Sequence, residues 1–266
     1  MKVLIIGGDR RMLFAAEFFK EKGFFVDTLG LKNNDGGDIS AADIIVLPVP
    51  ITRDKVNINC PLTGRKIPIE AIENLPDDMR VFGGGKLKIS NYTDYLALDE
   101  YALKNAAITA EGALAYAIDN TDFSLWQSRI LVIGYGKTGR ALTERLSGFH
   151  PDITVSARSG RDFAALQTLG LKNVKTSGIS AVKDRFDIVF NTVDIKFSEQ
   201  TAKAFFGALF FDISTSGGFA DGVIKKYNIN YKKLPSLPAA CAPESAGKII
   251  AETVINLQNT NGEKYA

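Results

Sequence analysis

Short apolar runs rich in valine and isoleucine alternate with helical patterns along almost the whole chain. In the first half, residues 3–6, 24–29, 43–48 and 80–82 fit buried strands, and residues 11–22 fit an amphipathic helix. Continuous apolar runs of this length are typical of parallel strands that helices cover on both faces. The alternation therefore predicts an α/β architecture.

The same alternation begins again after residue 120. The strand candidates of this second series are residues 129–133, 153–156, 173–175, 187–190, 208–212 and 229–231. A chain of 266 residues is long enough for about two domains. We predict one parallel-sheet domain over residues 1–120 and a second over residues 121–242. An alanine-rich helix over 98–118 would join them, and a final helix over 243–258 would pack back on the first domain.

A glycine-rich turn follows the first strand of the second series and opens a helical pattern. Its residues are Gly134, Tyr135, Gly136, Lys137, Thr138 and Gly139. In a GxGxxG turn the first glycine permits the turn, the second admits a pyrophosphate and the third allows close packing of helix on strand. The helix N-terminus adds N–H groups and partial positive charge. The turn predicts a dinucleotide site, with a purely structural glycine turn as the alternative.

The residue after the next strand predicts which dinucleotide binds. NAD enzymes normally place Asp or Glu there, about 20 residues beyond the last glycine, against the ribose 2′-hydroxyl. This chain has Arg158, flanked by Ser156 and Ser159. A guanidinium with neighbouring hydroxyl groups suits a 2′-phosphate, and Arg140 or Arg161 could add charge. We predict NADP, with NAD as the second choice and a solvated Arg158 as the alternative.

Polar residues end two further strands of the second series. Asn191 and Thr192 follow one strand, and Asp212 and Ser214 follow the next. Ligands of open α/β sheets bind outside the carboxyl ends of the strands. We therefore expect Asn191, Thr192 and Asp212 near the cofactor and Ser214 among the catalytic residues. Turn and cap roles are the alternative for each.

Cations follow the strands of the first domain in the same way. Arg10 and Arg11 follow the first strand, Arg53 the third, and Lys86 a run of glycines over 83–85. Guanidinium and ammonium groups pair with carboxylates. We predict that these four residues hold a small dicarboxylate in a cleft between the two domains, although each alone is also an ordinary surface residue.

Composition narrows the function classes. The 32 Lys+Arg and 30 Asp+Glu are scattered and leave a formal charge of +2, so neither a nucleic acid nor a membrane is predicted as a partner. Cys60 and Cys241 form no disulfide framework, no metal site is predicted, and no signal peptide is visible, which favours a soluble cytoplasmic protein. We expect Cys241 to be a buried thiol. The single histidine, His150, precedes a strand at the end opposite the ligands, which argues against histidine acid–base catalysis.

Four stretches together resemble the family of the dipicolinate synthase A subunit, found in endospore-forming bacteria. They are LIIGGDRR at 4–11, TAEGA at 109–113, the glycine turn at 134–139, and the proline-containing stretch at 237–247. The resemblance implies oxidation of a dihydrodipicolinate-type ring to pyridine-2,6-dicarboxylate with NADP or NAD during sporulation. It also implies that the partner is the flavoprotein-like B subunit of dipicolinate synthase, and it implies a place in the mother-cell cytoplasm.

Together these patterns predict two Rossmann-like domains in the arrangement of formate and glycerate dehydrogenases, with an NADP-dependent oxidoreductase activity. A dehydrogenase of another small carboxylate or amino acid is one alternative. A non-catalytic NADP-binding protein that serves a catalytic partner is the other. The oligomeric state, including a homo-oligomer, stays open.

Overall fold

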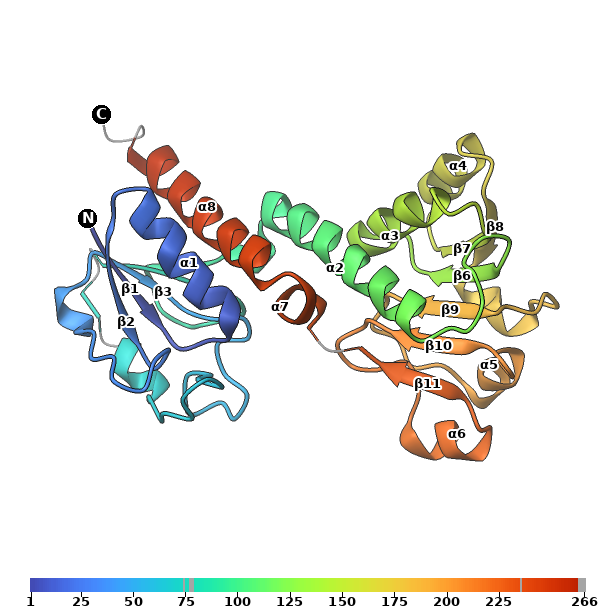
Figure 1. Ribbon diagram of the computed structural model, residues 1–266, viewed down its shortest axis with the longest axis horizontal. Helices are drawn as coiled ribbons and strands as arrows, with labels where there is room; N and C mark the ends of the chain where they lie inside the picture. Colours follow the sequence, from blue (N-terminus) through green and yellow to red (C-terminus); the bar gives the residue numbers. More distant parts are fainter. Residues whose placement is uncertain (74, 77–78, 235, 263–266) are drawn as a thin grey trace. The chain divides into compact units, whose positions relative to one another are not determined.

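The computed structural model describes residues 1–73, 75–76, 79–234 and 236–262, and divides into two compact units (Figure 1). Unit 1 comprises Met1–Asn105 and the chain from Cys241 onward, and unit 2 comprises Ala106–Ala240. The division lies inside helix α2 (Asp99–Asp119), not at residue 120 as the sequence predicts. The reason is that the second half of α2, including Leu114, belongs to the hydrophobic core of unit 2.

Unit 1 contains a five-stranded sheet in which all the paired strands are parallel, in the order β2-β1-β3-β4-β5. The strands are β1 (Lys2–Ile6), β2 (Phe25–Leu29), β3 (Ile44–Val46), β4 (Arg80–Gly83) and β5 (Tyr92–Asp94). The helices are α1 (Arg10–Glu21) and α8 (Pro243–Gly262), with single 3₁₀ turns at Ile39–Ala41, Ile69–Ile72 and Tyr95–Ala97. The chain order reverses between β1 and β3, so this is the point of the sheet where a ligand crevice is expected.

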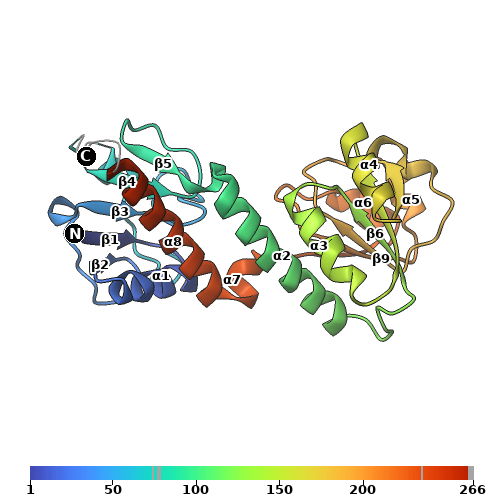
Figure 2. The same cartoon turned by 90° about the horizontal axis from the view of Figure 1, so that it is seen from above.

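The helices α1 and α8 lie side by side on one face of this sheet (Figures 1 and 2). Successive β1 residues alternate between the faces: Val3 and Ile5 pack under the helices, and Leu4 and Ile6 pack against the segment between β3 and β4. Gly247 lets α8 approach closely, because a Cβ there would lie 2.2 Å from the Arg11 carbonyl oxygen of α1.

Unit 2 contains a six-stranded sheet, again with parallel pairing, in the order β11-β10-β9-β6-β7-β8. The strands are β6 (Arg129–Ile133), β7 (Asp152–Ala157), β8 (Lys172–Lys175), β9 (Ile188–Asn191), β10 (Leu209–Asp212) and β11 (Asn230–Lys233). Besides α2 the helices are α3 (Lys137–Ser147), α4 (Gly160–Thr168), α5 (Glu199–Ala204), α6 (Asp221–Lys226) and α7 (Leu237–Cys241), with a 3₁₀ segment at Thr176–Ala181. Numbered from β6, this is the doubly wound order 3-2-1-4-5-6, which reverses between β6 and β9.

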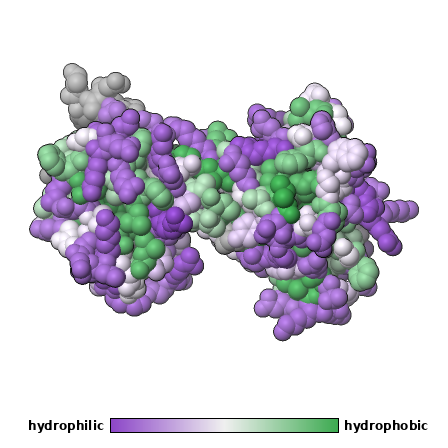
Figure 3. Space-filling model, viewed as in Figure 1, coloured by the Kyte–Doolittle hydropathy of each residue, from purple (hydrophilic) through white to green (hydrophobic). Residues whose placement is uncertain are grey.

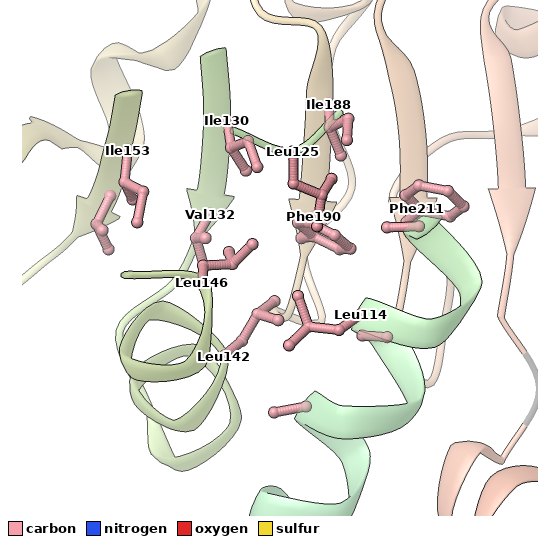
Figure 4. Packing of buried hydrophobic residues seen from close by; sticks show 14 of the residues in the cluster. Leu114, Leu125, Ile130, Val132, Leu142, Leu146, Ile153, Ile188, Phe190 and Phe211 are labelled. Atoms are coloured by element: carbon pink, nitrogen blue, oxygen red, sulfur yellow. The ribbon is translucent and has the colours of Figure 1, made fainter. Parts of the chain in front are cut away.

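The core of unit 2 lies on both faces of its sheet. On one face, Leu114 of α2 and Leu142 and Leu146 of α3 point toward Val132 of β6 and Phe190 of β9 (Figure 4). On the other, five aromatic or aliphatic side chains from the 3₁₀ segment, α5 and the loops cover β6, β9 and β10; they are Ile179, Ala202, Phe205, Phe219 and Ile229. Burial on both faces explains why the inner strands β6, β9 and β10 are mostly apolar.

Hydrophilic residues cover most of the visible face of both units, with apolar residues in small groups (Figure 3). Within the described residues, no helix has the length and apolar character needed to cross a membrane. The expectation of a buried thiol at Cys241 is wrong: this residue ends α7 and is exposed, whereas Cys60 is buried.

Candidate functional site

The glycine turn between β6 and α3 has the geometry that the sequence predicts. Gly134 has φ +100°, and a Cβ there would lie 2.4 Å from Val193 Cγ1. A Cβ on Gly139 would lie 2.1 Å from the carbonyl oxygen of Gly134, so only glycine lets α3 pack this closely on the turn. By contrast, no atom lies within 4 Å of a Cβ built on Gly136. The turn is therefore tight at its first and third glycines and open at its second.

The open space at Gly136 lies at the N-terminus of α3. Gly136 is the N-cap residue and has no side chain to bond the N–H groups of the first turn. The turn also sits where the strand order reverses, because Ile133 of β6 pairs with Ser156 of β7 on one side and with Asn191 of β9 on the other. An uncapped helix N-terminus with open space beside it fits the pyrophosphate of a dinucleotide.

Ser156 has a different role from the one that the sequence predicts. It is fully buried, and its Oγ accepts a hydrogen bond of 3.1 Å from the N–H of Gly134 and lies 3.2 Å from the hydroxyl of Thr176. It therefore holds the glycine turn. Ser159 caps α4: its Oγ accepts the Asp162 N–H at 3.1 Å and donates to the Asp162 carboxylate at 2.7 Å.

Arg158 follows β7 directly and is exposed, as expected for a residue that meets a 2′-phosphate. Lys175, at the end of β8, is in register with Ala157, so it lies beside Arg158 across the sheet. Neither side chain has a hydrogen-bond or ion-pair partner among the described residues. Arg140, in contrast, pairs with Asp162. Lys175 is not among the predicted residues, although its position at the carboxyl end of the neighbouring strand could have indicated it.

Asp212, Asn191 and Ser214 form one buried network at the carboxyl ends of β9 and β10. The Asp212 carboxylate accepts hydrogen bonds from the Ser214 N–H at 2.9 Å, the Ser214 hydroxyl at 2.5 Å, the Asn191 amide at 3.1 Å and the Tyr231 hydroxyl at 2.7 Å. The Gly218 N–H donates to the same carboxylate. These groups are used within the chain, so the network shapes the loop 213–218 and presents no free carboxylate or Ser214 hydroxyl.

Burial and hydrogen bonding act in opposite directions on Asp212. Burial raises the pKa of this carboxyl, but hydrogen bonds from Ser214, Tyr231 and Gly218 outweigh it and hold the pKa below its ordinary value. The pKa of Tyr231 is raised, first by burial and then by its bond to the Asp212 carboxylate. Asp212 is therefore a carboxylate and Tyr231 a phenol at neutral pH. The Lys196 ammonium completes the loop by donating to the carbonyl oxygens of residues 216 and 217, both at 2.7 Å.

Thr192 contacts the glycine turn from the β9 side. Its hydroxyl donates to the Ile133 carbonyl at 2.9 Å, and its Oγ1 would be 2.7 Å from a Cβ on Gly134. It thus borders the glycine turn, and its expected contact with the cofactor stays a prediction. The structure places Tyr135, Lys137 and Thr138 on the same turn and the first turn of α3, with Arg140 stacked 4.9 Å from the Tyr135 ring centre.

In unit 1, the loops after β1, β3 and β4 contact one another at the carboxyl edge of the sheet. The Gly8 N–H donates to the Asn59 carbonyl at 2.7 Å, and the Gly84 N–H donates to the Pro48 carbonyl at 3.3 Å. Arg10, at the start of α1, and Arg53 and Lys86, on the loops after β3 and β4, are exposed and have no ion-pair partner among the described residues. They stay candidates for binding an anion.

Arg11 differs from the other three predicted cations. It is only 4% exposed, and its guanidinium is bidentate to Asp9, at 2.9 and 2.8 Å, with a further bond of 2.7 Å to the Val49 carbonyl. Asp9 is also the N-cap of α1. Two N–H groups of Arg11 already bond to Asp9 and one bonds to the loop after β3. Arg11 therefore joins the loop after β1 to the loop after β3, and it has little capacity left to bind the carboxylate of a substrate.

Comparison with known proteins confirms the resemblance that the motifs predict. Residues 2–95 match the family described as the N-terminal domain of the dipicolinate synthase A subunit. The dipicolinate synthase A subunit of Bacillus subtilis (strain 168) is 25% identical over 287 residues, covering 97% of this chain and 95% of the relative. The similarity thus extends along both units.

Solved structures confirm the fold class. The crystal structure of the A subunit of dipicolinate synthase from Bacillus halodurans superposes with a TM-score of 0.87 at 23% identity, covering 96% of this chain and 97% of that one. The apo-structure of D-lactate dehydrogenase from Escherichia coli gives a TM-score of 0.64 at 14% identity, covering 99% and 97%. The chain therefore has two parallel-sheet α/β domains with the fold of these structures.

Proposed function

From the resemblance of this chain to the dipicolinate synthase A subunit, which extends along almost its whole length, we propose that it is an NADP-dependent oxidoreductase that forms pyridine-2,6-dicarboxylate. The observation that carries the proposal is the turn between β6 and α3, tight at Gly134 and Gly139 and open at Gly136. The bound nicotinamide would supply the hydride acceptor. The substrate is a dihydropyridine-type dicarboxylate.

Two regions of unit 2 would hold the cofactor. The N–H groups of the first turn of α3 would bind the pyrophosphate, with the open space at Gly136 admitting it. Arg158 and Lys175 would bind the 2′-phosphate, because both are exposed, adjacent across β7 and β8, and unpaired among the described residues. Arg161, on the first turn of α4, is a third exposed cation of this region.

The substrate needs cations for its carboxylates and little acid–base machinery. Arg10, Arg53 and Lys86 on the loops of unit 1 would supply the positive charge. Aromatisation of a dihydropyridine removes one hydride from a ring carbon and one proton, and the proton can leave to water. Asp212 is not required as a base, and the structure gives it another task, the shaping of the loop 213–218.

The direct test mixes purified protein, freshly generated dihydrodipicolinate and NADP, with and without the B subunit of dipicolinate synthase, and follows reduced cofactor and pyridine absorbance. Gly136→Val fills the space proposed for the pyrophosphate and should abolish NADP binding and turnover. Gly222→Ala is the matched control, since no atom lies within 4 Å of a Cβ at that position either and it is remote from the turn in the chain.

Three outcomes would contradict the proposal. If the wild-type protein does not bind NADP, both the proposed oxidoreductase activity and the alternative role as an NADP-binding protein are ruled out. Tight NADP binding without turnover in either mixture would favour the second candidate, a non-catalytic NADP-binding protein whose partner carries the chemistry. Turnover with another small carboxylate or amino acid, and none with dihydrodipicolinate, would identify a different dehydrogenase.

The setting of the reaction is part of the same proposal. We infer that the protein works with the B subunit of dipicolinate synthase in the mother-cell cytoplasm of a sporulating bacterium. The similarity to a protein named as one subunit of an enzyme supports a partner of this kind. Co-purification of the two proteins from sporulating cells, and its loss in vegetative cells, would test this setting.

A further inference from the structure

A pocket in unit 1 is built by the long segment between β3 and β4. Its volume is about 300 Å³, which is large enough for a small organic molecule. Residues that line it include Arg53, Asn59, Cys60, Arg65 and Lys66. We call it the Arg53 pocket. Of its cations, only Arg53 is among the site residues that the sequence predicts.

Two cations of the Arg53 pocket are unpaired. Arg53 and Lys66 are both exposed, and neither has a hydrogen-bond or ion-pair partner within the described ranges. Arg65 is held in place differently: its Nη1 donates to the Asp35 carbonyl oxygen at 2.8 Å and lies 3.6 Å from the Asp35 carboxylate. The pocket thus offers two free cationic groups beside a third that the fold fixes.

Asp54 lines the same pocket as a carboxylate but forms no ion pair with these cations among the described residues. Its carboxylate accepts hydrogen bonds from the N–H groups of Val56 at 2.9 Å and Asn57 at 2.7 Å, and from the Asn57 side-chain amide at 2.9 Å. These bonds, the backbone bond from Asn57 first, hold the pKa of Asp54 below its ordinary value. Its oxygens are therefore turned toward their own loop and are already satisfied.

Asn59 adds a neutral polar group on a fixed backbone. Its N–H donates to the Ile51 carbonyl at 2.7 Å, and its carbonyl accepts from the Gly8 N–H at 2.7 Å. Its side-chain amide, half-buried at the pocket wall, has no hydrogen-bond partner in the part of the chain that the structure describes. A half-buried amide gains a hydrogen bond if a ligand supplies an acceptor.

We propose that the Arg53 pocket binds a small dicarboxylate, with Arg53 and Lys66 each meeting one carboxylate and Asn59 donating to the ligand. The two unpaired cations indicate a ligand with two negative groups. The choice of a ring dicarboxylate rests on the proposed function, and it adds Lys66 and Asn59 to the unit 1 residues proposed to hold the substrate.

The test measures binding of pyridine-2,6-dicarboxylate to the full chain by calorimetry, in buffer free of divalent cations because this ligand chelates them. Arg53→Gln and Lys66→Gln should each weaken binding about tenfold or more, the effect of losing one charge-assisted hydrogen bond. Lys55→Gln is the matched control: Lys55 is exposed on the same loop, does not line the pocket, and its loss should change affinity less than about twofold. Pyridine-2-carboxylate and inorganic phosphate are the comparison ligands.

Each result decides the proposal. It is supported if the dicarboxylate binds at least about tenfold more tightly than the monocarboxylate and phosphate, and if this preference is lost in both variants. The proposal is overturned if the dicarboxylate does not bind, if Lys55→Gln weakens dicarboxylate binding as much as the two pocket variants do, or if phosphate binds as tightly as the dicarboxylate. NADP affinity and turnover, measured on the same samples, separate this proposal from the proposed function. If turnover is unchanged by Arg53→Gln and Lys66→Gln, only the proposal for the Arg53 pocket is overturned. If the wild-type protein does not bind NADP, the proposed function is overturned.

Discussion

Replacement of Gly139 by alanine sets two opposing effects against each other. Inside an ordinary helix, glycine to alanine stabilises by about 0.8–1 kcal/mol. In α3 the new Cβ would lie 2.1 Å from the carbonyl oxygen of Gly134 and 2.9 Å from its carbonyl carbon, closer than the 3.0 Å below which real Cβ contacts essentially never fall. The obstacle is backbone, so no side-chain rotation relieves it. We expect the overlap, at about 2–3 kcal/mol, to exceed the helix gain.

The expected net result is a loss of about 1–2 kcal/mol of unfolding free energy for unit 2, together with weaker NADP binding because α3 must shift away from the glycine turn. The single tryptophan, Trp126, belongs to unit 2, so its fluorescence during urea unfolding reports on the right domain. Gly222→Ala, in a helix of the same unit with no atom within 4 Å of the new Cβ, should be neutral or slightly stabilising. Equal or higher stability for Gly139→Ala would refute the close packing of α3 on the turn.

Three further outcomes follow from the contacts described. Arg158→Asp should lower the ratio of NADP to NAD efficiency about 10- to 100-fold, and an unchanged ratio in steady-state kinetics would remove Arg158 from the 2′-phosphate site. The folded-state pKa of Asp212 lies below the ordinary 3.8, so its carboxylate contributes to the free energy of unfolding above about pH 4, and this contribution is lost as the pH falls through the folded value. Asp212→Asn should therefore make the stability of unit 2 depend less on pH in the acid range. The same pH dependence in the variant and the wild type would contradict the hydrogen-bond network around Asp212. Gly247→Ala places a Cβ 2.2 Å from the Arg11 carbonyl oxygen and should destabilise unit 1 by about 1–3 kcal/mol in thermal unfolding, whereas Ser245→Ala, exposed on the same helix, should not.

The strands that could be predicted from the sequence are those buried on both faces of their sheet. Strands such as β1 and β6 are continuous valine, leucine and isoleucine runs because both faces are covered, so the sequence marks them clearly. The edge strand β5 escaped prediction: it has three half-buried residues, pairs only with β4, and carries no apolar run. The domain division was misplaced because α2 is one helix with apolar residues for both cores, including Tyr101 for unit 1 and Leu114 for unit 2.

The site was predictable where one stretch of chain carries the whole geometry. The glycine turn is such a stretch, since the requirement for glycine follows from contacts within residues 134–139 and their neighbours. The partners of the polar residues were not predictable. Ser156 bonds to Gly134 across 22 residues, and Tyr231 reaches Asp212 across 19, through the register of parallel strands that the sequence does not specify.

The first unit is built from two stretches of chain that flank the whole of the second. Helix α8 supplies Ile250, Ala251 and Val254 to the core formed by α1, β1 and β3. Because α8 follows Ala106–Ala240 in the chain, it can reach the core of unit 1 only after every segment of unit 2 has been synthesised. The usual N-terminal-first order is thus reversed. A chain truncated before α8 would contain all of unit 2, whereas its unit 1 would expose the apolar surface that α8 covers and would be prone to aggregate.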